Sequence, residues 1–371
     1  MPEIVMLITQ VLLFLAGGTI VVYTLMSAIR SFVLPRGDNV PLTRIVFRGM
    51  MRLFRWRLRK VDTYERRDRI MALFAPVSLL ILPVVWLALI VIGYMLMYLA
   101  VGAGDVYQSF KLSGSSLFTL GFFVVDVFPV TLLAFTEATI GLGLSAILIS
   151  YLPTMYAAFS RRETLVTLLE VRADSPPSAA AMIIRAHGVR GLDYLKELWV
   201  AWEIWFAEVE ESHTSLFAVC FFRSPQPDRS WVTAAGAVLD AAALMSSAID
   251  VPRTAEAQLC IRAGFVAMRH IADFFRIPYN PDPHFPDPIS ITREEFEDAL
   301  EQMAAAGVPI KADHDQAWQD FAGWRVNYDT VLLALCELVM APYAPWSSDR
   351  GLQQSVFRLI QDRSKIIGKA V

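Results

Sequence analysis

The residues best able to do chemistry in this chain lie in a short, weakly polar segment between two long apolar runs. Residues 107–123 read YQSFKLSGSSLFTLGFF, and they contain the tetrad Thr119, Leu120, Gly121 and Phe122. The Thr119 hydroxyl and the backbone carbonyls of the tetrad are groups that can replace the hydration shell of a cation. Gly121 supplies a position where φ can be positive. The segment therefore predicts an ion-coordinating loop at residues 119–122, preceded by a short helix over residues 107–118.

Three apolar runs are long enough to position this loop in a bilayer. They cover residues 4 to about 29, 71 to about 101, and about 129 to 159. A helix needs about 20 apolar residues to span roughly 30 Å of hydrocarbon. The first run lacks a basic region before it and is too long for a signal peptide, so we expect it to remain as a helix. The stretch between the second and third runs is too polar to span.

Composition separates the chain into two halves. The 371 residues are 55% hydrophobic and 19% charged, and nearly all the long apolar runs precede residue 160. We therefore expect an all-α membrane protein in which three transmembrane helices and a re-entrant loop are followed by an all-α cytosolic domain. The net charge of −3 says little about partners, and we expect no nucleic-acid partner. Cys220, Cys260 and Cys336 lie far apart, which favours three reduced thiols and no disulfide or zinc framework.

Lysine and arginine set the expected orientation. The stretch between the first and second runs is rich in arginine, whereas the loop over residues 102–128 contains only Lys111. By the positive-inside rule, the N-terminus and the 102–128 loop lie outside and the C-terminal domain is cytoplasmic. We expect a multi-pass protein of the plasma membrane.

Five arginines in the basic stretch recur at helical spacing: Arg44, Arg48, Arg52, Arg55 and Arg59. This spacing puts them on one face of an amphipathic helix, which we expect to contact the anionic inner leaflet of the membrane. A voltage-sensor helix is the alternative interpretation. It is disfavoured because neighbouring spans supply no acidic partners.

Residues 71–160 resemble the pore domain of the potassium-channel family, in which a pore loop lies between two helices. The tetrad Thr119, Leu120, Gly121 and Phe122 is similar to the Thr-Val-Gly-Tyr start of the family's selectivity filter. Gly141 and Gly143 lie where the family's inner helix has its glycine hinge. The resemblance covers about a quarter of the chain. It implies a homotetrameric pore that conducts K⁺, with Na⁺ as the other candidate ion.

The sequence departs from the family pattern after the tetrad. Phe123 occupies the place of the family's second filter glycine, and Val124 occupies that of the acid that usually follows. A residue with a side chain resists positive φ, so we expect a differently shaped outer mouth. Pro153 is expected to kink the third helix where a gate would lie.

Glu137 lies in the outer half of the third apolar run, where an acidic side chain would be inside the membrane and would need a hydrogen-bond partner. An ionisable residue inside a membrane is a functional hypothesis by default. It could support the pore by accepting hydrogen bonds from Ser115, Ser116 or Thr119. The alternatives are a carboxylate that faces the pore and an interfacial contact with water.

The remaining chain predicts helices over residues 163–171, 179–210, 232–248, 253–275, 292–305, 315–340 and 351–368. Thr292 and Glu295 form a capping-box pattern.

The stretch over residues 231–248 is apolar enough to suggest a fourth span, but a buried core helix is favoured. Trp199, Trp202 and Trp205 share one helix face, which favours a core or a subunit contact over a ligand site. Segments 282–287 and 313–315 hold Asp and His without the spacing of a known metal site. Segments 324–329 and 344–350 look specific, either for helix contacts or for a ligand pocket.

The expected domains are residues 1–34 (first helix), 35–70 (basic linker), 71–160 (pore domain, with its loop at 105–128) and 161–371 (cytosolic domain). The sequence contains no nucleotide-binding glycine loop, GxSxG or HExxH motif, so an enzyme is disfavoured. The first hypothesis is a homotetrameric cation channel that its cytosolic domain regulates or assembles. The alternative is a non-conducting, membrane-anchored sensor or scaffold whose helical domain binds partner proteins.

Overall fold

The computed structural model describes residues 2–32, 40–61, 63–252 and 254–350. In these ranges the regular structure is helical, as predicted, and the extended residues form one isolated bridge between Ile249 and Ile310. The chain divides into two compact units. We call Met1–Val61 with Ile70–Ala157 the membrane unit, and Asp62–Arg69 with Ala158–Val371 the C-terminal unit.

Three helices are long and apolar enough to cross a membrane: Glu3–Phe32, Tyr64–Ala100 and Phe128–Ala173. They correspond to α1 (Pro2–Phe32), α3 (Tyr64–Ala72) with α4 (Phe74–Ala100), and α6 (Phe128–Ala173). The prediction of three membrane-spanning candidates is therefore confirmed. The predicted end of the third helix at residue 159 is wrong, because α6 continues without interruption to Ala173. The chain has no proline or glycine between these points to end it.

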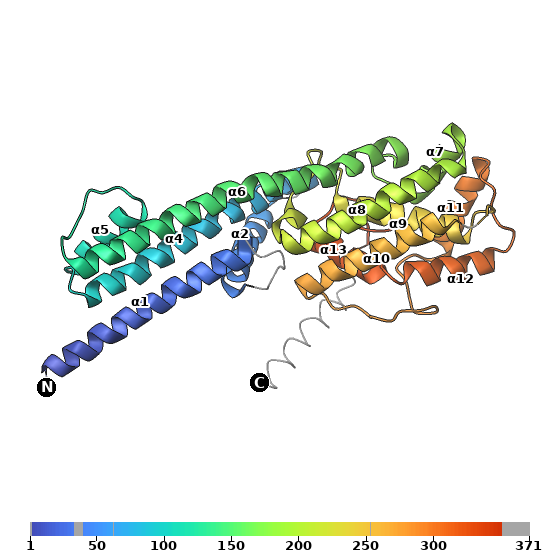
Figure 1. Cartoon of the computed structure of the whole chain (residues 1–371). Helices are drawn as coiled ribbons and strands as arrows, with labels where there is room; N and C mark the ends of the chain where they lie inside the picture. Colours follow the sequence, from blue (N-terminus) through green and yellow to red (C-terminus); the bar gives the residue numbers. More distant parts are fainter. Residues whose placement is uncertain (1, 33–39, 62, 253, 351–371) are drawn as a thin grey trace. The chain divides into compact units, whose positions relative to one another are not determined.

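Helices α1 and α4 pack through a pair of glycines in the membrane unit, where Figure 1 shows them side by side. A Cβ atom on Gly17 would lie 2.4 Å from the carbonyl oxygen of Gly93, and one on Gly93 would lie 2.9 Å from the carbonyl oxygen of Gly17. Only glycine permits this approach. Close backbone packing of this kind holds membrane helices together where lipid removes the hydrophobic driving force.

The predicted basic amphipathic helix is α2 (Pro41–Leu58). Its apolar side packs on the start of α4, where the rings of Phe47 and Phe54 lie 6.1 and 5.6 Å from that of Phe74, both edge-on. Arg48, Arg52 and Arg55 are exposed. The helix is therefore amphipathic, as predicted, and its contact with lipid remains a prediction.

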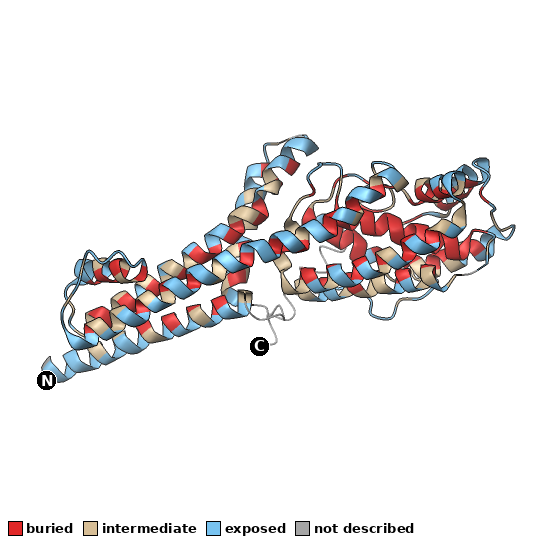
Figure 2. Ribbon diagram, turned by 45° about the horizontal axis from the view of Figure 1, so that its top comes forward, coloured by how far each residue is buried: buried red, intermediate tan, exposed pale blue. Residues whose placement is uncertain are grey.

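The C-terminal unit is built around α9 (Trp231–Ser247), every residue of which is buried. Figure 2 shows this helix as a continuous buried segment inside the unit. The sequence predicts a buried core helix here in preference to a fourth membrane span, and the burial of α9 by other helices agrees with that prediction. The helices that pack on it are α7 (Ala179–Val189), α10 (Ala255–Phe275), α12 (His314–Arg325) and α13 (Asp329–Val339). Helices α8 (Leu195–Ser215) and α11 (Arg293–Ala305) contribute to the same core.

Two of the predicted helices in this unit are in fact interrupted. Residues 179–210 form α7 and α8, separated at Gly191, whose φ of +82° belongs to the left-handed region that glycine favours. Residues 315–340 form α12 and α13, separated after Arg325. In each case apolar periodicity continues across a break that the pattern alone does not reveal. The predicted helix over residues 351–368 lies outside the described residues.

Two finer predictions about this unit are confirmed. Trp199, Trp202 and Trp205 are each at most 1% exposed and lie in the core. The capping box at the start of α11 forms as predicted, because Thr292 accepts from the Glu295 amide and Glu295 accepts from the Thr292 amide.

A buried ion network explains why segment 324–329 looked specific. Arg325 is fully buried, and its guanidinium donates to Asp240 on α9 at 2.5 Å and to Asp329 on α13 at 2.7 Å. It also donates to the carbonyl of Trp346 at 2.6 Å. Tyr328 donates its hydroxyl to Asp240 at 2.8 Å. The network therefore fixes α9, α12, α13 and the 344–350 segment together.

The carboxylates around Arg325 stabilise the charge on its buried guanidinium. Burial opposes the charge on Arg325, but the carboxylates of Asp240 and Asp329 outweigh it, so the pKa of the guanidinium lies above its ordinary value. Ser290 satisfies Asp329 further, through its amide at 2.9 Å and its hydroxyl at 2.6 Å. Both specific-looking segments are thus explained as helix contacts.

Replacing Arg325 with Met should lower the free energy of unfolding of the C-terminal unit by about 3–5 kcal/mol, because the carboxylates of Asp240 and Asp329 are left buried without a counter-charge. Arg293→Met is the matched control. It removes a half-exposed pair with Glu297 and should cost at most about 1 kcal/mol. Denaturant unfolding of the purified protein measures both. Equal losses in the two variants would contradict the importance of the network.

Candidate functional site

The candidate site begins with a short helix, α5 (Val106–Leu117), which lies within one residue of the predicted limits. Asp105 starts it with a capping box: its carboxylate accepts from the Gln108 amide at 2.8 Å, and the Gln108 side chain accepts from the Asp105 amide. In the membrane unit α5 packs against α4, and Figure 1 shows it beside the start of α6. The carbonyl end of α5, which carries partial negative charge, leads directly into the tetrad.

Backbone hydrogen bonds hold the tetrad against the end of α5. The Thr119 amide donates to the Ser116 carbonyl at 3.0 Å, and the Leu120 amide donates to the Ser115 carbonyl at 2.8 Å. The Ser115 hydroxyl accepts from the Phe123 amide at 3.1 Å. Ser115 and Ser116 therefore position the loop itself.

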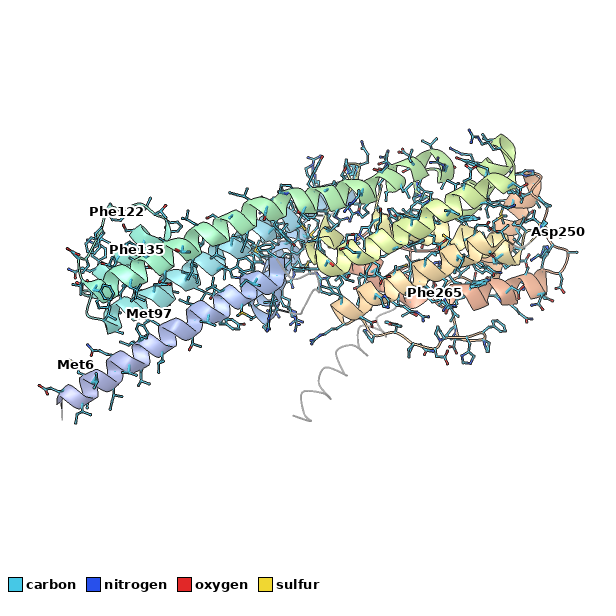
Figure 3. The ribbon with its side chains drawn as sticks, viewed as in Figure 1. Met6, Met97, Phe122, Phe135, Asp250 and Phe265 are labelled. Atoms are coloured by element: carbon cyan, nitrogen blue, oxygen red, sulfur yellow. The ribbon has the colours of Figure 1, made fainter. Side chains whose placement is uncertain are left out.

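Two residues of the tetrad adopt the left-handed backbone conformation. Gly121 has φ of +69°, as the sequence predicted for this position, and Thr119 has φ of +53°. A residue with a side chain is strained there, and such strain is typical of functional sites. All four residues of the tetrad are exposed in the single chain, with Leu120 at 62% and Phe122 at 65%. Figure 3 labels Phe122 in this loop and Phe135 on the nearby part of α6.

Glu137 connects α5 to the two long helices beside it, α4 and α6. Its side chain is fully buried. It accepts from the Ser113 hydroxyl of α5 at 2.5 Å and from the Tyr98 hydroxyl of α4 at 2.8 Å. Because Glu137 itself belongs to α6, one carboxyl group joins all three helices.

Of the three alternatives for Glu137, this geometry favours support of the short helix, because among the described residues its carboxyl is buried and bonded to both α4 and α5. The donors are Ser113 and Tyr98, in place of the predicted Ser115, Ser116 and Thr119. A role for Glu137 in a pore remains a prediction. Sequence reasoning missed Tyr98, which lies inside an apolar run. The sequence did offer one signal: Tyr94 and Tyr98, four residues apart on one helix face, place two hydroxyl groups within this apolar run.

The two residues that follow the tetrad, Phe123 and Val124, have different surroundings. The Lys111 ammonium lies 4.5 Å from the centre of the Phe123 ring and 4.8 Å from that of Tyr107. Phe123 is thus held by side-chain packing, whereas Val124 is 74% exposed. The loop then runs to α6 with Val127 and Phe128 exposed as well.

The two glycines predicted as a hinge in α6 have different surroundings. A Cβ atom on Gly141 would lie 2.1 Å from the Leu117 carbonyl oxygen, so this glycine allows α6 to approach the end of α5. Around Gly143 there is no atom within 4 Å of such a Cβ position. Helix α6 runs through Gly141, Gly143 and Pro153 without interruption. Hinge motion at these residues remains a prediction.

One exposed face of α6 carries small and hydroxyl-bearing side chains at intervals of three and four residues. We call this face the small-residue stripe. It comprises Thr136, Thr139, Gly143, Ala146, Ser150, Pro153 and Ala157.

The end of α6 is anchored in the C-terminal unit by Arg162, which is 2% exposed. Its guanidinium donates to Glu163 at 2.7 Å and to the carbonyls of Val219 and Phe222 at 2.8 and 2.9 Å. It also lies 3.3 Å from Nε2 of His213. A guanidinium can only donate, so Nε2 accepts and the ring is neutral. Burial, with the Arg162 charge beside it, holds the pKa of His213 well below its ordinary value.

The same short segment also holds the residues that precede α4. Residues 216–223 include η2 (Phe217–Phe221), which supplies the Val219 carbonyl that binds Arg162. Arg223, at the end of this segment, pairs with Asp68 at 3.2 Å and donates to the Tyr64 hydroxyl at 3.4 Å. Asp68 and Tyr64 belong to α3. One segment of the C-terminal unit therefore contacts both chain stretches that continue into membrane helices.

Comparison with known proteins adds no relative to this description. No protein-family model, curated protein or solved structure matches the chain.

Removing either hydroxyl that binds Glu137 should destabilise the membrane unit. We expect Ser113→Ala and Tyr98→Phe each to lower the melting temperature in detergent by about 2 °C or more, because each leaves a buried carboxyl oxygen without its hydrogen-bond partner, which costs about 1–3 kcal/mol. Ser145→Ala is the control, since this hydroxyl bonds only the Gly141 carbonyl of its own helix. Equal melting temperatures in all three variants would show that the hydrogen bonds to Glu137 do not hold α5 in place.

The neutral His213 predicts a specific dependence of stability on pH. Its folded pKa is depressed, so below pH 6.5 the unfolded chain binds a proton that the folded chain does not. Stability therefore falls as the pH falls. From pH 7.5 to 5.5 this one residue should account for about 1.4 kcal/mol. Denaturant unfolding at the two pH values should show a smaller loss for His213→Gln, and an unchanged loss would refute the assignment.

Proposed function

We propose that this protein is a homotetrameric cation channel of the plasma membrane that conducts K⁺ in preference to Na⁺. The observation that carries the proposal is the tetrad of residues 119–122. It is a non-helical loop with left-handed backbone at Thr119 and Gly121, held at the carbonyl end of a short helix between two long apolar helices. Irregular backbone at membrane depth is stable only where it is buried in protein or lines a water-filled cavity. Backbone carbonyls in such a loop are the ligands that replace the water around K⁺.

Assembly into four copies follows from the geometry of a single loop. One tetrad supplies one strand of carbonyls and cannot surround an ion, whereas a ring of four related by closed symmetry can. The exposed Leu120 and Phe122 side chains would then be covered by neighbouring copies. In the same ring the small-residue stripe of α6 would line the path of the ion. The departures at Phe123 and Val124 lie beyond the tetrad, so they would shape the outer entrance.

Regulation by the C-terminal unit is supported by residues 216–223. This segment contacts α6 through Arg162 and contacts α3, which leads into α4, through Arg223. A movement of the C-terminal unit would therefore act on the chain on both sides of the loop. In this proposal the C-terminal unit is cytoplasmic and the N-terminus lies outside.

The matched glycine variants Gly121→Ala and Gly114→Ala test the function. At both positions a Cβ atom would have no neighbour within 4 Å, but only Gly121 has positive φ. In liposomes containing the purified protein, we expect K⁺ flux to exceed Na⁺ flux. Gly121→Ala should reduce or abolish this flux, because a left-handed conformation costs alanine about 1–2 kcal/mol in each subunit. Gly114→Ala should leave it unchanged.

The alternative function predicts a different result when the same liposomes and purified protein are measured. A non-conducting, membrane-anchored scaffold would give no flux in either ion and a mass that is not tetrameric. Flux that is lost in Gly121→Ala but shows no preference for K⁺ would keep the pore and refute the selectivity. Flux that survives equally in both glycine variants would refute the tetrad as the filter.

A further inference from the structure

A groove of about 610 Å³ runs along the exposed side of α1, away from the tetrad. Its walls are apolar over most of their length, with Phe14, Leu15 and Val22 among them, and the exposed fractions of these side chains are 39%, 59% and 61%. The last turn of α1 and the first residues of α2, Val40 and Pro41, close one end of the groove. The groove lies entirely within the membrane unit.

Two polar side chains of the groove, Ser27 and Arg30, lie at this closed end, whereas the hydroxyl of Thr19, further along α1, already donates to the Leu15 carbonyl. Ser27 lines this end, is 3% exposed, and its hydroxyl has no hydrogen-bond partner among the described residues. A buried hydroxyl without a partner is uncommon and calls for an explanation. Arg30 also lines this end, is exposed, and pairs with no acidic side chain among the described residues. The closed end therefore offers a cation and an unused hydroxyl beside an apolar channel.

Helix α2 adds further attraction for an anion at the same place. It begins at Pro41, and the cap residue Val40 contributes no side-chain hydrogen bond. The first amides of a helix have no carbonyl acceptor within it and carry partial positive charge. A hydrogen bond of 2.7 Å between the Ser31 and Thr43 hydroxyls holds this helix start against the end of α1.

The dimensions fit one leaflet of a bilayer. From Phe14 to Met26 the helix rises by about 18 Å, against roughly 15 Å for half of a hydrocarbon core of about 30 Å. An acyl chain lying along the apolar walls would bring its headgroup to Arg30. Under the orientation proposed above, this end lies at the cytoplasmic leaflet, which carries the anionic lipids.

We propose that this groove binds one anionic phospholipid per chain, with an acyl chain along α1 and the headgroup phosphate at Arg30, Ser27 and the start of α2. The site is separate from the exposed arginine face of α2. It does not depend on ion conduction. The experiment below does not measure flux, so its failure would leave the proposed function untouched.

Native mass spectrometry of the purified protein, titrated with phosphatidylglycerol or phosphatidylcholine, tests the site. We expect one tightly bound phosphatidylglycerol per chain and weaker binding of phosphatidylcholine. Arg30→Gln should weaken the phosphatidylglycerol affinity by about fivefold or more, whereas Arg30→Lys should retain most of it. The matched control is Arg57→Gln, an exposed arginine in the last turn of α2 that does not line the groove.

A second pair of variants tests the acyl-chain part of the groove. Gly18 lines it, and a Cβ atom there would have no neighbour within 4 Å, so Gly18→Phe should fill the groove without disturbing the packing of α1 on α4. We expect this variant to lose the bound phosphatidylglycerol. Gly49→Phe, at an equally open glycine of α2, should keep it.

Three outcomes would overturn the proposal. Equal weakening by Arg30→Gln and Arg57→Gln would indicate attraction to the basic surface as a whole. Unchanged binding in Gly18→Phe would show that no acyl chain lies in the groove. Dissociation of the oligomer in Gly18→Phe would show that a second copy of the chain covers it.

Discussion

The position of the tetrad depends on one carboxyl group, that of Glu137, which is buried among three helices of the membrane unit. A bilayer offers no water to irregular backbone, so a loop between two membrane helices must be supported by protein. Glu137 receives one hydroxyl from α5 and one from α4, and so fixes the short helix from which the tetrad extends. The left-handed conformations at Thr119 and Gly121 then rest on a fixed base. Backbone hydrogen bonds to Ser115 and Ser116 then hold the tetrad against the end of this helix.

The C-terminal unit uses the same device, a buried charge shared among helices. Arg325 joins α9, α12 and α13, and it is satisfied by carboxylates from two of them. Such networks specify one arrangement of helices, because each partner left alone would be a buried charge. Arg162 does the same at the end of α6. The helix that follows the tetrad is therefore held at both ends by buried polar groups, Glu137 at one end and Arg162 at the other.

Local patterns in the sequence predicted much of this architecture, and long-range contacts could not be predicted. Apolar runs located the three long helices, and the polar stretch between two of them located α5 and the tetrad. The capping box at Thr292 was recognisable because its partners lie three residues apart. The donors to Glu137 were not recognisable from the sequence. Tyr98 is 39 residues away from Glu137, and the direction of its side chain depends on how α4 is rotated about its axis. The Asp240–Arg325 pair, 85 residues apart, was hidden for the same reason. The break at Gly191 was missed for a local reason, because the apolar periodicity continues across it.

The central claim is that the tetrad forms a cation-selective pore, and the most direct measurement is the reversal potential of currents through purified protein in a planar bilayer. With KCl on one side and NaCl at the same concentration on the other, the account predicts single-channel currents that reverse at a potential set by preferential K⁺ permeation. Currents that reverse at zero would show that the pore does not select K⁺ over Na⁺. A protein of tetrameric mass that carries no current at any voltage of either sign would contradict the account.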